Sequence, residues 1–289
     1  MFIGEPKCNN APGACRVSLE TRFSATMSST PLTNLIDALH QTLRVPLQVE
    51  QLREVTFDIP QEVDIFDLVQ EICKYEELEK DSWHVIKTTI KEDTLYIRQF
   101  CCTLSQGIAS TVTSHLMLDI GRVSKLELTV FVDTQGRCAK QADNGILPLR
   151  RTDWPSVVVE VGYKETMTEL YQHADDWMVM TAGVQFPLKL VILVKLYPET
   201  KEMRLEFLQR APSRNSKLPH HAIPVPNLGP FEWSMDSVSD ANISAIPTIK
   251  LPLDLLYDEI PARIIEAGPV EMTRDAHLQE WVESCLKRL

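Results

Sequence analysis

Several features that mark common protein classes are missing from this sequence. Glycine accounts for only 10 of the 289 residues, and no glycine-rich phosphate loop, dinucleotide-binding fingerprint or serine-hydrolase elbow occurs. No apolar run is long enough to cross a bilayer, and the N-terminus lacks a basic segment followed by an apolar one. We therefore expect no membrane partner and no secretory signal, and an intracellular location in the cytoplasm or the nucleus.

Positive charge is also in short supply. Lysine and arginine number 29 against 40 aspartate and glutamate residues, which gives a formal net charge of −11. Tight nucleic-acid binding requires phosphate neutralisation by clustered basic side chains, so the net charge disfavours a nucleic-acid partner. The densest basic group comprises Arg137, Lys140, Arg150, Arg151 and Lys164. We interpret the adjacent Arg150 and Arg151 as part of a solvated loop surface.

The seven cysteines are odd in number and scattered, and no two of them are separated by two residues. This spacing argues against a structural zinc site. Cys101 and Cys102 are adjacent and cannot readily pair with each other. We expect reduced thiols, which agrees with an intracellular compartment.

The chain is long enough to bury a sizeable core. It has 289 residues, of which 44% are hydrophobic, and this fits one elaborated α/β domain. Residues 1–31 are polar and are expected to be disordered. The domain then spans residues 32–289, with a core at about 121–210, a proline-rich loop or arm at 211–247 and an amphipathic C-terminal helix at 271–288.

Hydrophobic periodicity predicts the secondary structure. Apolar residues at helical spacing indicate helices at 32–44, 61–79 and 165–181. Strand-forming residues indicate strands at 55–59, 126–133, 157–161, 188–197, 202–209 and 248–256. A hairpin turn at 134–136 would return the chain into 137–142, whereas 83–120 is ambiguous between helix and strand. The alternation of strands with a connecting helix predicts an α/β sheet.

Two acids stand out against this pattern. Glu160 interrupts the apolar run 157–161, which is typical of a strand covered on both faces, and a charge there is costly unless it is paired or binds a cation. Asp143 precedes Asn144-Gly145, a turn signal. If a hairpin over residues 126–142 lies beside the 157–161 strand, the two carboxylates meet at one end of the sheet. Two carboxylates with water and a phosphate suit Mg²⁺, which polarises a phosphodiester and activates water.

Each acid also has a simpler interpretation. Glu160 would be a buried acid held by an arginine or a lysine, with no metal. Asp143 would be a turn residue whose carboxylate caps the backbone. The sequence leaves these alternatives open.

The segment resembles the PD-(D/E)XK nuclease-like superfamily, in its divergent fungal-type form. The resemblance rests on Lys140-Gln-Ala-Asp143, on Trp154-Pro-Ser-Val-Val-Val-Glu-Val-Gly162, on the helix with Leu170, Ala174 and Trp177, and on the strand Leu188–Leu196. It implies a restriction-endonuclease-like central mixed sheet flanked by helices, with N-terminal helices and a C-terminal arm and helix. It also implies that Asp143 and Glu160 hold a magnesium ion.

One position departs from the family's pattern, because Gly162 stands where the resemblance implies a lysine. That lysine would position the attacking water and offset developing negative charge. Lys164 is the preferred substitute, since strand alternation puts Lys140 on the opposite face from Asp143. We predict a degenerate nuclease-like protein that binds a small molecule or a protein partner, or catalyses a different reaction in the same cleft. The alternative is a Mg²⁺-dependent phosphodiesterase that uses Asp143, Glu160 and Lys164.

Overall fold

The chain is a mixed α/β protein made of two compact units. The computed structural model describes residues 30–44, 52–78, 85–91, 93–100, 108–109, 112, 123–127, 130–132, 138–148, 151, 154–212, 221–234, 249–260, 265 and 270–271. Unit 1 comprises residues 1–103 and 130–141, and unit 2 comprises residues 104–129 and 142–289. The predicted core at about 121–210 is therefore divided, because residues 130–141 belong to unit 1.

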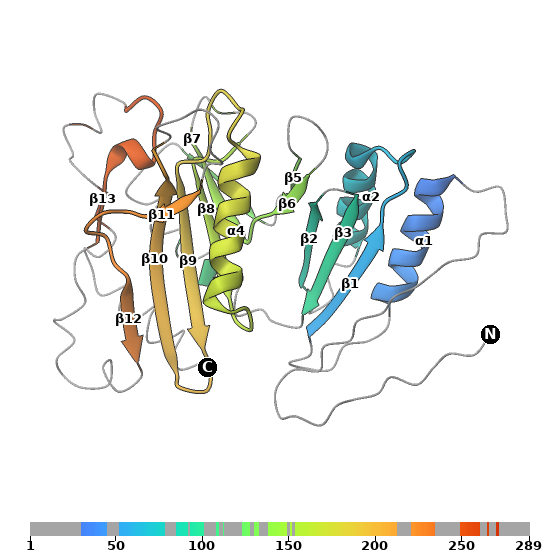
Figure 1. Ribbon diagram of the computed structural model, residues 1–289, viewed down its shortest axis with the longest axis horizontal. Coiled ribbons are helices and arrows are strands. Elements are labelled where there is room, and N and C mark those ends of the chain that lie inside the picture. Colours follow the sequence, from blue (N-terminus) through green and yellow to red (C-terminus); the bar gives the residue numbers. More distant parts are fainter. Residues whose placement is uncertain are drawn as a thin grey trace. The chain divides into compact units, whose positions relative to one another are not determined.

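Unit 1 contains a five-stranded antiparallel sheet and two helices, shown in Figure 1. The helices are α1 (Pro31–Leu43) and α2 (Ile65–Leu78). The strands are β1 (Leu52–Asp58), β2 (Val85–Lys91), β3 (Thr94–Phe100), β5 (Val130–Val132) and β6 (Ala139–Gln141). They lie in the order β1-β3-β2-β6-β5. The helices and one sheet face share a core that includes Leu39, Leu68 and Ile97.

The starts of both helices follow from local capping. Thr30 precedes α1, and its side chain accepts a hydrogen bond from Thr33 N. Asp64 precedes α2, and its Oδ1 accepts hydrogen bonds from Phe66 N at 2.8 Å and Asp67 N at 3.2 Å. Side chains of this kind satisfy the amides that a helix leaves unpaired at its start. The cap at Asp64 explains why α2 begins later than the predicted residue 61.

Unit 2 contains a seven-stranded mixed sheet. Its strands are β4 (Val123–Glu127), β7 (Asn144–Pro148), β8 (Val157–Gly162), β9 (Leu190–Tyr197), β10 (Glu202–Arg210), β11 (Ala222–Pro224) and β12 (Phe231–Ser234). The order is β11-β10-β9-β8-β7-β4, and β12 also pairs with β10. β8 and β9 are parallel, and α4 (Met167–Met180) connects them. Unit 2 also contains β13 (Lys250–Leu251), which pairs with β14 (Val270–Glu271), and the short helix η2 (Leu253–Leu255).

The two faces of β8 have different neighbours. Val157, Val159 and Val161 belong to an apolar core that also contains Trp233 and Tyr257. The alternate positions face α4, which lies across β8 and β9 in Figure 1. All six residues of β8 are buried. The prediction of a strand covered on both faces is confirmed.

Three predictions for unit 2 are corrected by its strand pairing. Asn144 and Gly145 begin strand β7, and they are not a turn, because pairing with β4 and β8 outweighs their local turn preference. The predicted strand 126–133 is two strands, β4 and β5, in different sheets. The predicted arm 211–247 contributes β11 and β12 to the sheet, where they pair with β10.

Other predictions fall largely outside the described residues. They concern the N-terminal segment 1–31 before Thr30, the turn at 134–136 and the C-terminal helix 271–288, of which only Glu271 is described, in β14. Of the residues that are described, Cys73 and Cys138 are not in disulfides. No helix in the described ranges is both long and apolar enough to cross a membrane.

Candidate functional site

Glu160 lies in the middle of β8 and points towards α4. Its side chain is buried, with 1% of the residue exposed. Oε1 accepts a hydrogen bond of 2.6 Å from Trp177 Nε1, and Trp177 is fully buried on α4. A buried carboxylate is tolerated when a donor replaces the water that it loses. The indole of Trp177 is therefore one donor to this acid, and the sequence did not predict it.

Asp143 lies directly before β7 and is also buried, with 2% exposed. In the β7–β8 register Asn144 is opposite Val159, so one further step places Asp143 opposite Glu160. Asp143 Oδ2 accepts a hydrogen bond of 2.7 Å from Val161 N. The structure thus places the two predicted acids opposite each other, Glu160 on β8 and Asp143 directly before β7.

Gln141, two residues before Asp143, also accepts a hydrogen bond from a main-chain amide through its side chain. Gln141, at the end of β6, accepts a hydrogen bond of 3.0 Å from Thr88 N through Oε1. Between these two residues the chain leaves the sheet of unit 1 and enters the sheet of unit 2. A strand that changes sheets leaves amide donors on its former and its new neighbours, and buried donors need an acceptor. Asp143 therefore has a structural role that requires no metal.

Gly162 is the position at which the resemblance implies a lysine. A Cβ atom added there would lie 2.7 Å from Cδ1 and 3.0 Å from Cδ2 of Leu170 on α4. Leu170 is fully buried. Interiors are packed closely enough that a longer side chain at this position forces its neighbours to move. Leu170 thus fills the space that a lysine at residue 162 would need.

Lys164, the predicted substitute, is exposed in the turn between β8 and α4. The amine closest in register to Gly162 is instead that of Lys195 on β9, directly opposite Gly162. Lys195 Nζ donates hydrogen bonds to Tyr163 O at 3.1 Å and Leu196 O at 2.8 Å. Both acceptors lie beyond Gly162 on the side away from Glu160. The sequence signal for Lys195 was a lysine within the apolar stretch 190–196, and the prediction missed it.

Burial is the main influence on the charge of Lys195. Only 7% of the residue is exposed, and desolvation lowers the pKa of its ammonium group. Glu165, Glu199 and Glu169 offset part of this effect through their negative charge. In the described part of the chain, no carboxylate lies within ion-pair distance of Nζ. The lysine holds the ends of β8 and β9 together through main-chain carbonyls, and Tyr197 lies 4.9 Å from Nζ.

The ligands available for a metal ion are few. Among the described residues, no group of three or more histidine, cysteine, aspartate or glutamate side chains is arranged to hold one. Asp143 and Glu160 would contribute two carboxylates, and Mg²⁺ accepts such oxygen ligands while it keeps several waters. Each carboxylate would first have to give up or share the hydrogen bond described above.

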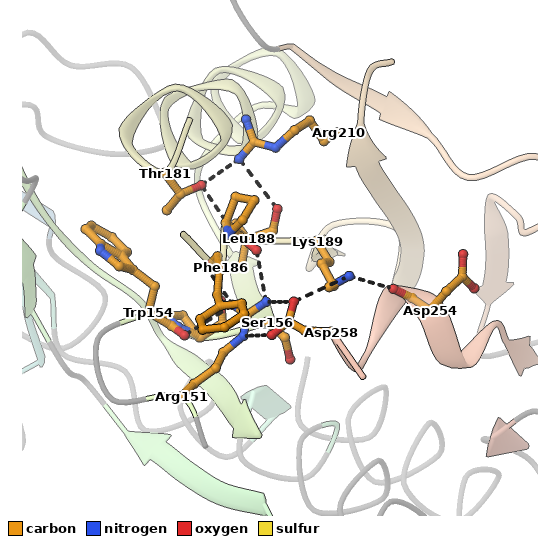
Figure 2. A network of polar contacts seen from close by, with 12 residues as sticks. Arg151, Trp154, Ser156, Thr181, Phe186, Leu188, Lys189, Arg210, Asp254 and Asp258 are labelled. Carbon is orange, nitrogen blue, oxygen red and sulfur yellow. Dashed lines mark hydrogen bonds and ion pairs between the residues drawn. The ribbon is translucent and has the colours of Figure 1, made fainter. Parts of the chain in front are cut away.

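Arg151 forms a second polar centre in unit 2, shown in Figure 2. Its Nη2 and Nε bind the two carboxylate oxygens of Asp258 at 2.6 Å each. Its remaining donors reach main-chain carbonyls of Trp154, Pro155, Phe186 and Pro187. Only 2% of its side chain is exposed. The interpretation of Arg151 as part of a solvated loop surface is wrong, because the planar guanidinium fits a bidentate carboxylate and several carbonyls at once.

Asp258 is held at this centre by two cations. Lys189 Nζ lies 3.5 Å from its Oδ1 and also donates to Asp254 O at 3.1 Å, as Figure 2 shows. Burial raises the pKa of Asp258, but hydrogen bonds and charge from Arg151, and then Lys189, outweigh burial and leave the pKa below its usual value. The cluster fastens the segment around η2 to the start of β9.

Arg210 caps the C-terminal end of α4. Its Nη1 donates to Met178 O at 2.5 Å, and its Nη2 donates to Thr181 Oγ1 at 2.6 Å. A cation at this end of a helix satisfies carbonyls that the helix leaves unpaired. At the start of α4, Thr166 and Glu169 form a capping box. The first-turn acid is thus Glu169, and the helix begins at Met167, later than the predicted residue 165.

Replacing Trp177 with phenylalanine is expected to lower the free energy of unfolding by about 3 kcal/mol. The variant removes the indole donor from the buried Glu160 carboxylate and leaves a small cavity. Urea unfolding followed by far-UV circular dichroism measures the effect. The matched control makes the same change in a Glu160→Met background, where the loss should be clearly smaller because no carboxylate is left unsatisfied. Equal losses in both backgrounds would contradict this role for Trp177.

No protein-family model matches the chain, and no curated protein matches it in sequence. The likeness to PD-(D/E)XK nuclease-like proteins therefore stays a prediction, carried by residues 140–196 alone.

Proposed function

We propose that this protein has a degenerate PD-(D/E)XK nuclease-like fold without the hydrolytic chemistry, and that it acts by binding a protein partner. The observation that carries the proposal is the contact of α4 with β8 at Gly162. A Cβ atom at residue 162 would already lie 2.7 Å from Leu170 Cδ1. A lysine in this position would therefore require the side chain of Leu170 on α4 to move.

The two acids support the same conclusion. Glu160 accepts a hydrogen bond from Trp177, and Asp143 accepts one from Val161 N. Both hydrogen bonds stabilise the interior of unit 2. Neither nearby amine offers a replacement for the missing lysine, since Lys164 is exposed and Lys195 donates to carbonyls on the side away from Glu160.

The charge of the chain favours a protein partner over a nucleic acid. The net charge of −11 would repel a phosphate backbone and attract a basic protein surface. A small-molecule ligand would instead require an enclosed apolar pocket with a few polar groups.

Calorimetric titration of Mg²⁺ and Mn²⁺ into the full-length protein tests the proposal. We expect no saturable binding up to millimolar metal, because both carboxylates are buried and each already accepts a hydrogen bond from the protein. Glu160→Gln and Asp143→Asn are expected to leave the titration unchanged. Saturable binding to the wild type that disappears in Glu160→Gln would overturn the proposal.

That opposite result would favour a second candidate, a Mg²⁺-dependent phosphodiesterase. The observation in its favour is the extended β7–β8 register, which places Asp143 opposite Glu160. These two residues would hold the metal, and the metal would polarise the phosphodiester and activate water.

A further inference from the structure

β1 forms an open edge of the sheet in unit 1. Within the described residues, β3 is the sole strand that pairs with β1, and β1 stands at the end of the strand order. The pairing runs without a bulge from Leu52 opposite Phe100 to Asp58 opposite Thr94. The strand has seven residues and contains neither proline nor glycine.

The main-chain groups on the outer side of β1 have no strand partner among the described residues. In the described part of the chain, no main-chain hydrogen bond besides the β1–β3 ladder involves residues 55–58. An edge strand carries unpaired N–H and C=O groups on alternate residues, and these accept an added strand. Proteins usually block such an edge with proline, a bulge or charged side chains. β1 has no proline and no bulge, and its charged residues are the buried Arg53 and the acids Glu54 and Asp58.

The side chains of β1 alternate between the core and the solvent. Val55 and Phe57 are buried in the core of unit 1. On the other face Thr56 and Asp58 are exposed, and Glu54 is half-buried beside Arg98 at 2.9 Å. Asp58 has no ion pair with any described residue. The solvent face of the edge therefore carries two acids, one of them without a cation.

An exposed aromatic ring lies on the same face. Tyr96 on β3 is directly opposite Thr56, and 43% of Tyr96 is exposed. A strand added outside β1 would lie about 4.8 Å from it. A long basic side chain opposite Thr56 could extend over this small residue to the tyrosine ring, where a cation is attracted by the face of the ring.

We propose that the open edge of β1 binds an extended lysine- or arginine-rich segment of a partner protein by strand addition. Basic residues at alternate positions of that segment pair with Glu54 and Asp58, and one between them extends towards Tyr96. The site lies in unit 1 and involves none of the residues around Glu160. The proposal therefore goes beyond the proposed function and holds whether or not unit 2 binds a metal.

Charge also decides against a second copy of the chain as the occupant. An antiparallel pair of two β1 strands centred on Thr56 would place Glu54 of each copy opposite Asp58 of the other. Like charges opposite each other destabilise a strand pair. The same two acids would repel the phosphates of a nucleic acid.

Fluorescence anisotropy with the full-length protein tests the proposal. The probe is a fluorescein-labelled, nine-residue peptide in which lysine alternates with valine. We expect a control peptide with glutamate in place of lysine to bind at least about tenfold more weakly. A lysine–valine peptide with N-methylated main-chain amides should lose binding, because it keeps the side chains but lacks the ladder donors. Equal affinity of either control peptide would overturn the proposal.

A pair of charge variants and a mapping experiment locate the site. Asp58→Lys should weaken binding of the lysine peptide about fivefold. Asp37→Lys makes the same charge change at an exposed position of α1 and should leave affinity nearly unchanged. Hydrogen exchange should show new protection in residues 52–58 when the peptide binds. Equal effects of the two variants, protection confined to other residues, or a dimer that protects 52–58 without peptide would each refute this assignment.

Discussion

Replacing Arg151 with methionine is expected to lower the free energy of unfolding of unit 2 by about 3–5 kcal/mol. Removing one partner of a buried ion pair leaves the other charge without compensation, and losses of about that size follow. Here the variant also leaves carbonyls of Trp154, Pro155, Phe186 and Pro187 without their donor. Urea unfolding followed by tryptophan fluorescence measures the effect, since four of the five tryptophans belong to unit 2 and only Trp83 belongs to unit 1.

Lys189→Met is the matched control for this prediction. Lys189 contacts the same carboxylate, but its side chain is 24% exposed and its distance to Asp258 is 3.5 Å. Partly exposed ion pairs of this kind contribute about 1 kcal/mol or less. Arg151→Lys should remain close to Arg151→Met, because a single ammonium group cannot form the two parallel hydrogen bonds. A loss of less than about 1 kcal/mol in Arg151→Met would show that the cluster is dispensable.

Introducing the missing lysine as Gly162→Lys is expected to cost about 3 kcal/mol or more and to produce no nuclease. Overpacking a core typically costs about 1–3 kcal/mol, and burying the amine adds to this cost. The added side chain would meet Leu170, whose Cδ1 would lie 2.7 Å from the new Cβ atom. Urea unfolding gives the stability, and nicking of supercoiled plasmid in Mg²⁺ gives the activity.

A double variant separates the contact with Leu170 from general damage. Leu170→Ala alone should cost about 2–5 kcal/mol through the cavity that it leaves. Combined with Gly162→Lys, it should cost clearly less than the two single changes added together, because the lysine enters the vacated space. Strict additivity would mean that Leu170 is not what excludes a side chain at residue 162. Nuclease activity in the double variant would support the phosphodiesterase candidate.

The central part of unit 2 was readable from the sequence because several local signals agree there. The apolar run 157–161 predicted β8, the stripe with Leu170, Ala174 and Trp177 predicted α4, and the run 188–197 predicted β9. The two strands bury nearly all of their residues and α4 buries one stripe, so periodicity and burial indicate the same element in each case. Tyr171 on the same helix is 38% exposed, and its hydroxyl donates to Glu206.

The remaining elements depend on partners distant in the chain. β11 and β12 lie among prolines and have only three and four residues, and their pairing with β10 defines them. Asn144-Gly145 has the composition of a turn, but it lies between β4 and β8. Arg151 could not be recognised as buried, because its partner Asp258 is 107 residues away in sequence. Tertiary pairing overrides local preference in each case.

The candidate site was predicted in part. Asp143 and Glu160 do lie opposite each other, but the expected reason was wrong, because the hairpin of β5 and β6 belongs to the sheet of unit 1 and β7 is the strand beside β8. Their donors were not predicted, because Trp177 was assigned to the apolar stripe and the amide of Val161 carries no side-chain signal. The space at Gly162 depends on how closely α4 approaches β8, and only three-dimensional packing determines that distance.

Unit 1 is made of two segments that are separated in sequence by part of unit 2, and this affects the order in which the sheets can form during synthesis. β2 pairs with β6, but residues 104–129, which belong to unit 2, separate β6 from the rest of unit 1. As the chain leaves the ribosome, the edge of β2 therefore stays unpaired until residues 139–141 have been synthesised. By then β4 has already emerged. Contacts between segments this far apart form slowly, and unpaired edges favour aggregation in the interval. A nascent chain halted near residue 103 would carry an unfinished sheet, so unit 1 is completed only after the first part of unit 2 has been synthesised.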